Sequence, residues 1–502
     1  MEIQVFSYIP HPMSINVEKL LTMKEKEVMK VIWECKIVEG KMGLTEKQGM
    51  ENRKFHTGEF HESIWTKDIT MPQFPQLKGD IRTKVLIIGG GITGLLCAYF
   101  LKQAGVDYCL VEKNRICSGI TRGTTAKITS QHGLIYHKLL KSMGQERAAM
   151  YLKAGEMAVS RYRTMGRQFD CDMEEKDSYI YMREKPYPLE RELAALEKLG
   201  YPAELAEHLP LPFETAGAVR FPDQLQFHPL KFAAMIASGL NIYENSGVRE
   251  MTEYLALTEN GTIAAEKVIV ATHFPFLNTR GSYFIKMYQQ RAFVLALSAG
   301  PDVQGMYRDG KKDGLSFRNQ KDVLLVGGGS RRTGHGLRDK RDFEALRATV
   351  SDILPQTRVI AEWAAQDCMS LDDMPYIGHY SKNTPDLFVA TGYNKWGMTN
   401  SMVAAILLTD LVQEKENEYA PLFSSSRSML RPQLAINAFE AAKGILHPTD
   451  RYRCSHMGCV LHWNREEKTW ECPCHGSRFD EEGGLLDNPA MEGMNRKPEN
   501  GK

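Results

Sequence analysis

Residues 84–112 read KVLIIGGGITGLLCAYFLKQAGVDYCLVE, and they decide the expected fold. Val85–Ile88 is an apolar, mostly β-branched run between a lysine and a glycine, which predicts a buried parallel strand. A helix is expected over Leu95–Gln103, ended by Gly105, and a second strand over Tyr108–Val111. This order of strand, glycine turn, helix and strand predicts an α/β fold with a Rossmann-like parallel sheet.

The glycines of this stretch indicate a dinucleotide site. Gly89, Gly91 and Gly94 follow the G-x-G-x-x-G spacing. The first permits a tight turn, the second lets backbone approach a pyrophosphate, and the third lets the helix pack on the strand. Free N–H groups at the helix N-terminus attract phosphate. Glu112 ends the second strand about 20 residues after the glycines, where a carboxylate accepts hydrogen bonds from a ribose 2′-hydroxyl.

Length, composition and net charge limit the classes of protein to which this chain can belong. The chain has 502 residues, of which 43% are hydrophobic and 25% charged, and this length holds about two or three globular domains. The net charge of +1 gives no basic field for nucleic acid and no polybasic block for a membrane surface. Because a run of about 18 apolar residues and a signal-peptide core are both missing, we expect no transmembrane segment and a cytoplasmic location.

The N-terminal segment gives little indication of a fold or a function. Residues 1–65 are expected to form an extension of unassigned function, in which Ile15–Ile37 has the pattern of a charged amphipathic helix. Met50 is a plausible alternative start of translation.

Four of the ten cysteines fall between Cys454 and Cys474, which indicates a site rather than a disulfide framework.

Two segments between the ends need an interpretation. The loop after Glu112 is rich in small and hydroxyl residues, including Thr124 and Thr125, and suits a loop wrapped around a cofactor; an ordinary polar loop is the alternative. Val323–Val326 is followed by GGGSRRTG, which invites a second nucleotide turn. Arg332 stands where the third glycine is needed, so we predict a strand and tight turn instead, and no dock for NAD(P)H.

A second glycine turn lies late in the chain. Lys267–Thr272 and Leu387–Thr391 each predict a buried strand. Residues 392–400, GYNKWGMTN, then lead into an apolar helix over Met402–Val412. The N-terminus of such a helix can stabilise negative charge on a reduced flavin ring.

These features resemble the D-amino-acid oxidase and glycine oxidase class of FAD-dependent oxidoreductases, over roughly residues 80–415. The resemblance implies FAD as the dinucleotide, a flavin domain of separate segments, and an inserted α+β substrate domain with an antiparallel sheet. The implied FAD-binding segments are about 80–150, 228–275 and 365–415, and the substrate domain about 155–225 and 280–360. The implied cofactor-binding residues are Gly89, Gly91, Gly94, Glu112, Lys113, Thr124, Thr125, Val248, Thr272, Gly392, Gly397, Met398 and Thr399.

That class oxidises amines and amino acids, but no substrate residue can be assigned from the sequence, and the catalytic acid or base is unknown. Arginine suits a carboxylate through bidentate hydrogen bonds. Four side chains of the inserted region are candidates, each with a structural role as the alternative: Tyr288, Arg291, Tyr307 and Arg318. His132 lines the flavin pocket or fills the core. Cys368 lies near where sarcosine-oxidase-like relatives attach flavin covalently, but its spacing differs, so a buried structural cysteine is expected.

Residues 454–479, CSHMGCVLHWNREEKTWECPCHGSRF, carry the strongest motif. Cys454 with His456 and Cys472 with His475 form two Cys/His pairs on two loops. A Rieske centre uses two thiolates on one iron and two imidazoles on the other. Zinc could use the same four ligands, but it leaves the two further cysteines of the stretch unexplained.

The stretch closely resembles the Rieske proteins of respiratory cytochrome bc complexes. The resemblance implies a [2Fe–2S] cluster on these four ligands, a disulfide between Cys459 and Cys474, and a hydrogen bond from Ser477 to a cluster sulfide. Phe479 replaces the tyrosine of the high-potential proteins, which predicts a lower potential within the range of roughly −150 to +300 mV. The domain, expected at 447–495, is small and all-β, and a linker at 421–446 joins it to the flavin domain.

FAD and a Rieske centre in one chain predict an electron-transfer enzyme. The leading hypothesis is dehydrogenation of a small amine or amino-acid-like substrate at FAD, with electrons relayed singly through the cluster to an external carrier. A reductase fed through the cluster is the first alternative. A redox sensor whose FAD does not turn over is the second, from a different functional class.

Overall fold

The computed structural model describes residues 2–3, 15–16, 62–252, 254–277, 280–335, 342–447 and 452–496. Of the helix predicted over Ile15–Ile37, only Ile15–Asn16 is described. These two residues form a strand, β2 (Ile15–Asn16), because they pair with β1 (Glu2–Ile3). The remainder of that helix and Met50 lie outside the described residues.

An eight-stranded, mainly parallel sheet contains the glycine turn. Its central strand is β3 (Ile81–Ile88), which pairs in parallel with β4 (Tyr108–Val111) and β12 (Thr262–Val270). Val85, Leu86 and Ile87 are fully buried, as expected for a strand covered on both faces. The other strands are β9 (Ile242–Tyr243), β10 (Glu250–Met251), β11 (Leu255–Leu257), β18 (Tyr376–His379) and β19 (Leu387–Thr391).

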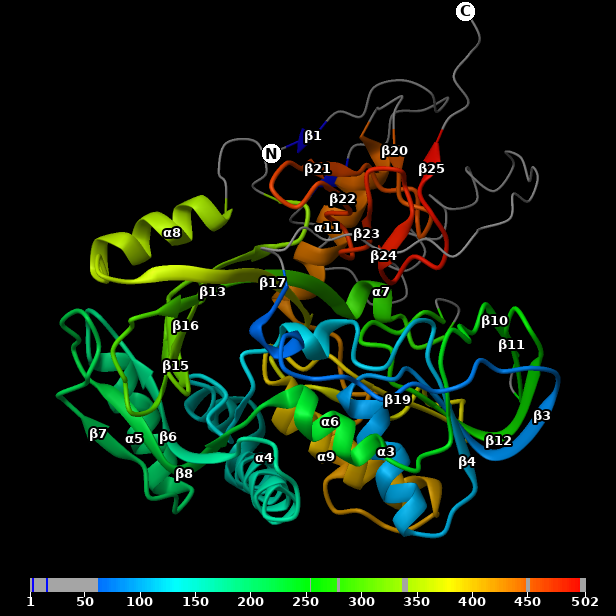
Figure 1. Cartoon of the computed structure of the whole chain (residues 1–502), viewed down its shortest axis with the longest axis horizontal. Coiled ribbons are helices and arrows are strands. Elements are labelled where there is room, and N and C mark those ends of the chain that lie inside the picture. The colour runs from blue at the N-terminus through cyan, green and yellow to red at the C-terminus, as the bar shows by residue number, and fades with distance from the viewer. Residues whose placement is uncertain are drawn as a thin grey trace, which may run out of the picture.

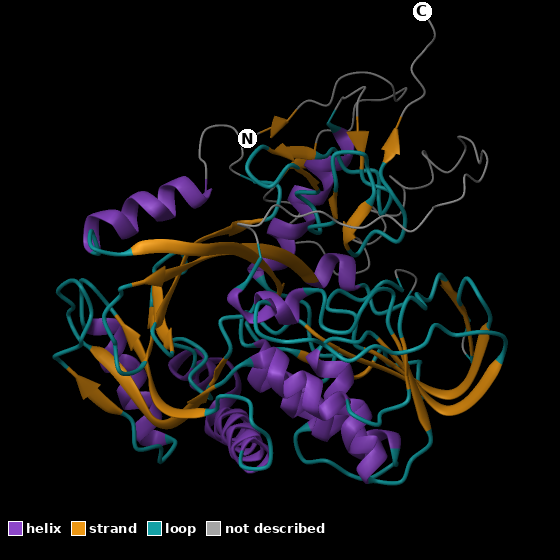
Figure 2. Ribbon diagram, in the orientation of Figure 1, coloured by secondary structure: helices purple, strands orange, loops and turns teal. Residues whose placement is uncertain are grey.

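Helices cover one face of this sheet (Figures 1 and 2). The helix α3 (Ile92–Gln103) packs against α6 (Pro229–Ala237) and α9 (Gly397–Val412), and α9 packs in turn against α4 (Tyr136–Gly166). Both α3 and α9 are buried on most sides, which explains their high apolar content. The long helix α4 is interrupted at Gly144, whose φ is 82°.

A nine-stranded sheet forms the second layer, with the strand order β17-β13-β16-β15-β14-β6-β8-β5 and β7 paired to β8. Its pairs are antiparallel except β14 with β6. The predicted antiparallel substrate sheet is therefore confirmed, with one parallel pair. The strands are β5 (Lys127–Ile128), β6 (Glu174–Tyr181), β7 (Glu204–Ala206), β8 (Ala218–Gln226), β13 (Met287–Ser298), β14 (Met306–Asp309), β15 (Ser316–Gln320), β16 (Val323–Arg332) and β17 (Arg358–Ser370). Its helices are α5 (Tyr187–Lys198), α7 (Tyr283–Lys286) and α8 (Asp342–Ile353).

The glycine run rejected as a second nucleotide turn lies inside β16, which continues to Arg332. Gly327 pairs with β13 and β15, and Gly328 pairs with β13. Gly329, with a φ of 64°, lies at the irregularity where the register with β13 shifts. The predicted strand is therefore confirmed, but the tight turn expected after Val326 is wrong, because the strand continues through the glycines to Arg332.

The C-terminal part is a small β module above β13 and β17 in Figure 1. The segment 421–446, expected as a linker, is mostly helical: α10 (Ala420–Phe423) is followed by α11 (Pro432–Leu446). The module's own core is small and contains four cysteines. Its strands are β20 (Tyr452–Arg453), β21 (His462–Asn464), β22 (Thr469–Glu471), β23 (Arg478–Phe479), β24 (Leu485–Asp487) and β25 (Asn495–Arg496). Over the described ranges, no helix is both long and apolar enough to cross a bilayer.

Candidate cofactor and cluster sites

The glycine turn after β3 has no space for a side chain at its first and third glycines. A Cβ on Gly94 would lie 1.9 Å from the Gly89 carbonyl oxygen, and a Cβ on Gly89 would lie 2.6 Å from the Ala271 carbonyl oxygen. Gly89 also has a φ of 112°. Helix α3 begins after Gly91, which has no side chain to cap it. The N–H of its first residue, Ile92, donates to the Thr121 hydroxyl at 3.1 Å, so the N–H groups that follow in the first turn are the ones available to a phosphate.

Glu112 at the end of β4 closes this turn. Its Oε2 accepts a hydrogen bond from the Gly90 N–H at 2.7 Å, and its Oε1 accepts one from the Asn114 N–H at 2.9 Å. Lys113 beside it is exposed. The structure thus places the carboxylate beside the glycine turn, at the strand end where the sequence pattern expects it.

The hydroxyl-rich loop is anchored by two large side chains. Trp65 donates its indole N–H to the Thr124 carbonyl at 2.8 Å, and Arg318 donates to the Thr125 carbonyl at 3.0 Å. Trp65 is only 1% exposed. The end of the segment expected as an unassigned extension therefore belongs to the loop's packing, and its tryptophan was the available signal.

Two further candidate residues lie at the carboxyl ends of the sheet. Thr272 follows β12 and donates its hydroxyl to the Phe274 carbonyl at 2.9 Å. Val248 lies in the loop after β9 and is 7% exposed, packed in the core on the β3 and β4 side.

The turn before α9 has an unusual backbone. Gly392, Asn394 and Lys395 have positive φ values of 73°, 52° and 74°. The Asn394 side chain holds the turn by donating to the Gly392 carbonyl at 2.7 Å and accepting from the Ser370 N–H at 2.9 Å. This backbone arrangement orients the turn toward the N-terminus of α9.

The N-terminus of α9 is open to a ligand. Its N-cap residue, Trp396, makes no side-chain capping hydrogen bond, so the N–H groups of the first turn, from Gly397 onwards, are available. Met398 is fixed by the Tyr162 hydroxyl, which donates to its carbonyl at 3.0 Å. Thr399 donates to the Thr129 carbonyl at 2.8 Å.

Two buried histidines support the binding of a polar cofactor between β12 and α9. His132 Nε2 is buried with no hydrogen-bond partner, and His273 is buried beside Gln289 and Gln366, with its Nε2 lacking a well-aligned partner. The ring of His132 stacks on Trp396, with centroids 5.1 Å apart, and burial lowers its pKa to about 3. His273 directly follows Thr272. Since buried polar atoms without partners are rare, these nitrogens together with the open helix ends fit a polar cofactor between β12 and α9.

Three charged residues near this turn were not predicted. Arg308 of β14 lies over the Trp396 ring at 5.3 Å, and Lys395 donates to the Ser330 hydroxyl at 2.5 Å. Burial, together with the positive charge of Arg308, lowers the pKa of Lys395 to about 7. Burial raises the pKa of Asp367 on β17. They come from three separate segments, so no local pattern could have found them.

The substrate candidates named from the sequence have structural partners. Arg291 is ion-paired with Glu467 of the C-terminal module. Arg318 also donates to the Ala126 carbonyl at 2.9 Å. Tyr307 stacks on Tyr179 with centroids 4.7 Å apart, and Tyr288 lies under the guanidinium of Arg332 at 4.8 Å. These partners favour the structural alternative.

Cys368 is 2% exposed and its thiol contacts the His273 carbonyl at 3.4 Å. Burial raises the pKa of this thiol well above its ordinary value. Both observations fit the structural cysteine expected from the sequence.

The two loops of the C-terminal motif bring like ligands together. The Cys454 and Cys472 thiols share a hydrogen bond, which lowers the pKa of Cys472, whereas burial raises that of Cys454. The rings of His456 and His475 lie 4.9 Å apart at 89°. Two adjacent thiols beside two adjacent imidazoles are a donor set that fits one [2Fe–2S] cluster.

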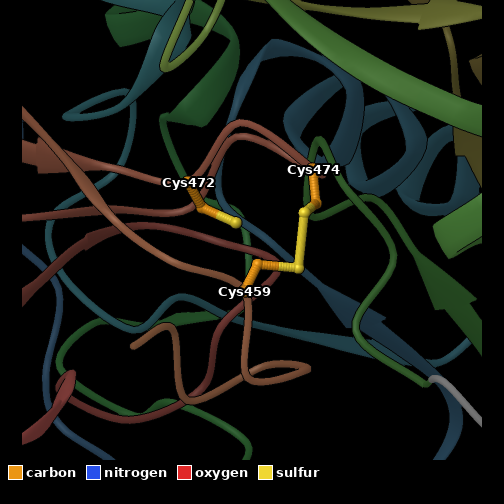
Figure 3. A group of neighbouring side chains, drawn as sticks. All are labelled: Cys459, Cys472 and Cys474. Atoms are coloured by element: carbon orange, nitrogen blue, oxygen red, sulfur yellow. A yellow bond between two sulfur atoms is a disulfide. The ribbon is translucent and has the colours of Figure 1, made fainter. Parts of the chain in front are cut away.

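The remaining two cysteines form a bond of their own. Cys459 and Cys474 are joined in a disulfide, with 6.7 Å between their Cα atoms. Figure 3 shows the Cys472 sulfur beside this disulfide, within 4.8 Å of both its sulfurs. Because disulfide sulfurs are not thiolates, these three sulfurs are not a metal set, and Cys472 remains available to pair with Cys454. Ser477 is fully buried, and its hydroxyl accepts the Ala490 N–H at 3.0 Å.

Residues 84–411 match the family described as FAD dependent oxidoreductase. The chain belongs to this family. Residues 427–498 of this oxidoreductase match the Rieske [2Fe-2S] domain. Both matches confirm the predicted cofactors, so the protein binds FAD and a [2Fe–2S] cluster.

Relatives and solved structures extend these matches. The putative Rieske 2Fe-2S iron-sulfur protein YhfW of Bacillus subtilis (strain 168) is 32% identical, over 88% of this oxidoreductase and 98% of the relative. Gamma-glutamylputrescine oxidoreductase of Escherichia coli (strain K12) is 26% identical over 76% of this chain and 97% of its own length. The crystal structure of glycine oxidase from Geobacillus kaustophilus aligns with a TM-score of 0.57 and 22% identity, covering 69% of this chain and 99% of that one. This structural likeness confirms the predicted fold class.

Proposed function

We propose that the protein oxidises a small amine or amino-acid-like substrate at FAD and relays the electrons through its Rieske cluster to an external carrier. One observation carries the proposal: the module packs directly against the residues that follow β12, where FAD is expected, and the His475 ring of one cluster loop contacts Phe274 there. The carbonyls of Thr272 and Phe274 accept hydrogen bonds from Asn488 of the module at 2.8 and 2.6 Å.

In this proposal the two sheets have separate tasks. The eight-stranded sheet holds FAD, with Gly89, Gly91 and Gly94 against the pyrophosphate, Glu112 on the ribose, and the N-terminus of α9 toward the flavin ring. The nine-stranded sheet bounds the substrate. Cys454, His456, Cys472 and His475 hold the cluster. FAD supplies a two-electron acceptor and the cluster a one-electron carrier.

Three ionisable side chains on the substrate side, Lys395, Arg308 and Asp367, would bind the charged groups of a substrate and exchange a proton with it. Lys395, with a pKa of about 7, can take up a proton from a substrate ammonium near neutral pH. Arg308 and Asp367 lie close enough to interact electrostatically with it, so an anionic and a cationic part of a substrate would each meet an opposite charge.

Cofactor content is tested first. Absorbance and EPR of anaerobically purified protein, with iron, sulfide and zinc assays, should show flavin bands and a dithionite-induced Rieske signal. Zinc without sulfide would reduce the module to a structural tail and overturn the relay.

The direction of electron flow is tested next by anaerobic stopped-flow with a panel of amines and amino acids. Flavin bleaching before cluster bleaching is the expected order. The opposite order would favour the reductase fed through the cluster, and failure of every substrate and reductant to cycle the flavin would favour the redox sensor. The cytoplasmic location stays a prediction, which cell fractionation tests.

A further inference from the structure

We propose that His475 is the cluster ligand through which electrons pass between the FAD site and the cluster, and that Gln289 is the residue that positions it. This inference rests on the proposed electron relay, and names the route inside the chain.

The contacts of His475 point toward the FAD side. Gln289 of β13, which is 1% exposed, donates its amide to the His475 carbonyl at 2.8 Å and to the Asn488 carbonyl at 2.9 Å. The imidazole of His475 contacts the rings of Phe274 and Phe284, with centroids 6.5 and 6.3 Å away. Phe274 follows β12, so this ligand lies against the strand end assigned to FAD.

A second glutamine fixes the orientation of Gln289. Gln366 of β17 donates to the Gln289 amide oxygen at 2.7 Å and to the Gly476 carbonyl at 2.9 Å. Its own amide oxygen accepts from the Thr333 hydroxyl at 3.1 Å. Since every member of this buried network has a partner, it holds the His475 loop in one position.

The loop approaches the sheet too closely for any other residue at position 476. Gly476 has a φ of 86°, and a Cβ there would lie 2.6 Å from the Gln289 Cβ. The backbone of the His475 loop therefore rests directly on the Gln289 side chain of β13.

The two imidazole ligands differ in their surroundings. His475 is 2% exposed and its ring lies against Phe274 and Phe284, whereas His456 is half-buried and therefore more accessible to solvent. The rings lie 4.9 Å apart at 89°, so they point along different directions from the cluster. This asymmetry gives the cluster one inward ligand for exchange with FAD and one outward ligand for exchange with a carrier.

Electron counting fits this arrangement. Each oxidised substrate releases two electrons, and a [2Fe–2S] cluster accepts one at a time. The route through His475 is therefore used twice per turnover, and an external one-electron carrier removes the first electron before the second passes.

The test compares two matched glutamine variants of the full holoenzyme. Gln289→Met keeps the length of the side chain and removes its amide. Gln226→Met is the control, because Gln226 is also 1% exposed and in the same sheet but contacts the Asn319 carbonyl instead of the module. Anaerobic laser flash photolysis with deazariboflavin follows electron exchange between flavin and cluster.

Gln289→Met is expected to slow this exchange by about tenfold, equivalent to about 1.4 kcal/mol, and Gln226→Met to leave it unchanged. The midpoint potential and EPR spectrum of the cluster should stay as in the unmodified protein, whereas a merely structural role would change them together with the rate.

Other outcomes separate the two proposals. Equal exchange rates in Gln289→Met and Gln226→Met would overturn the route through His475 and leave the relay intact. No exchange in the unmodified protein would overturn the relay itself. If Gln289→Met loses its cluster, Gln366→Met takes its place, and loss of the cluster in both variants would make the network structural and overturn the proposal.

Discussion

At the scale of single residues, Gly94 makes the first prediction. Gly94→Ala would place a methyl group 1.9 Å from the Gly89 carbonyl oxygen, so the turn and the start of α3 must shift. We expect loss of bound FAD and a free energy of unfolding lower by about 1–3 kcal/mol, the cost of overpacking. Flavin absorbance after gel filtration and urea unfolding measure both effects.

Gly119→Ala is the control, because Gly119 is exposed and a Cβ there would have no neighbour within 4 Å. Wild-type FAD content in Gly94→Ala would contradict the assignment of this turn to the pyrophosphate.

Lys395 makes a prediction about pH. Its buried position disfavours the charged form, so the pKa falls from 10.5 to about 7. The groups that act on it are Arg308, Asp367 and Lys312. Substrate-driven flavin reduction should therefore accelerate as the pH rises through about 7, where the lysine becomes neutral and can accept a proton. Stopped-flow pH profiles give the rate.

Lys395→Met should lose this acceleration and react about 100-fold more slowly, the usual contribution of a general base. Lys395→Arg, which keeps the positive charge at all accessible pH values, should behave like Lys395→Met. An unchanged inflection near pH 7 in either variant would assign the ionisation to another group.

At the scale of elements, the two cluster loops depend on their disulfide. Cys459 and Cys474 are 15 residues apart, and closing a loop of about 15 residues stabilises by about 3 kcal/mol in the chain-entropy treatment. Replacing both with alanine should therefore shorten the half-life of the cluster in the presence of a chelator, followed by visible circular dichroism.

Dithiothreitol supplies the matched comparison. It should shorten the cluster's half-life in the unmodified protein and have no further effect on the double variant. A double variant with an unchanged half-life would show that the surrounding sheet, rather than the disulfide, holds the loops.

At the scale of the whole molecule, buried charges join the Rieske module to the substrate sheet. Glu471 of β22 is fully buried and faces Arg331 at 3.4 Å, and Arg291 and Arg478 at 3.7 Å each. Removing one partner of a buried ion pair leaves an uncompensated charge and costs about 3–5 kcal/mol. Glu471→Gln should therefore lower the free energy of unfolding by about that amount in urea denaturation.

The exposed pair Arg249–Glu259 supplies the control, and Glu259→Gln should change stability by less than about 0.5 kcal/mol.

The same carboxylate makes a prediction about pH. Burial alone would raise the pKa of Glu471, but Arg291, Arg478 and Arg331 together hold this pKa below its ordinary value of 4.5. A lowered carboxyl pKa stabilises the folded state above pH 4.5, and this contribution is lost as the pH falls through the folded value. Glu471→Gln should lack this acid-dependent part, and an unchanged acid dependence would place it on another carboxyl group.

The same scales show where sequence-based prediction reached its limit. Apolar runs predicted the strand β4, and glycine spacing predicted where the glycine turns begin. Both predictions were possible because each pattern lies within a few consecutive residues. The segment 421–446 was expected as a linker, although Pro432–Leu446 is a helix packed against the module. A Cβ at Gly444 of this helix would lie 2.5 Å from the Cys474 sulfur, so the packing of the helix depends on a partner that is distant in the sequence.

Local patterns in the sequence were sufficient for the family and the two cofactors, because each motif consists of residues a few positions apart on a loop or turn. The four cluster ligands that we propose come from two such motifs on neighbouring loops. Only the tertiary structure showed which side chains from separate elements come together at the sites we propose. Arg308, Asp367 and Lys395 converge from β14, β17 and the turn before α9, and Gln289 reaches His475 across 186 positions of sequence. Contacts of this kind depend on how sheets stack, and stacking depends on the packing of the whole core rather than on any local pattern.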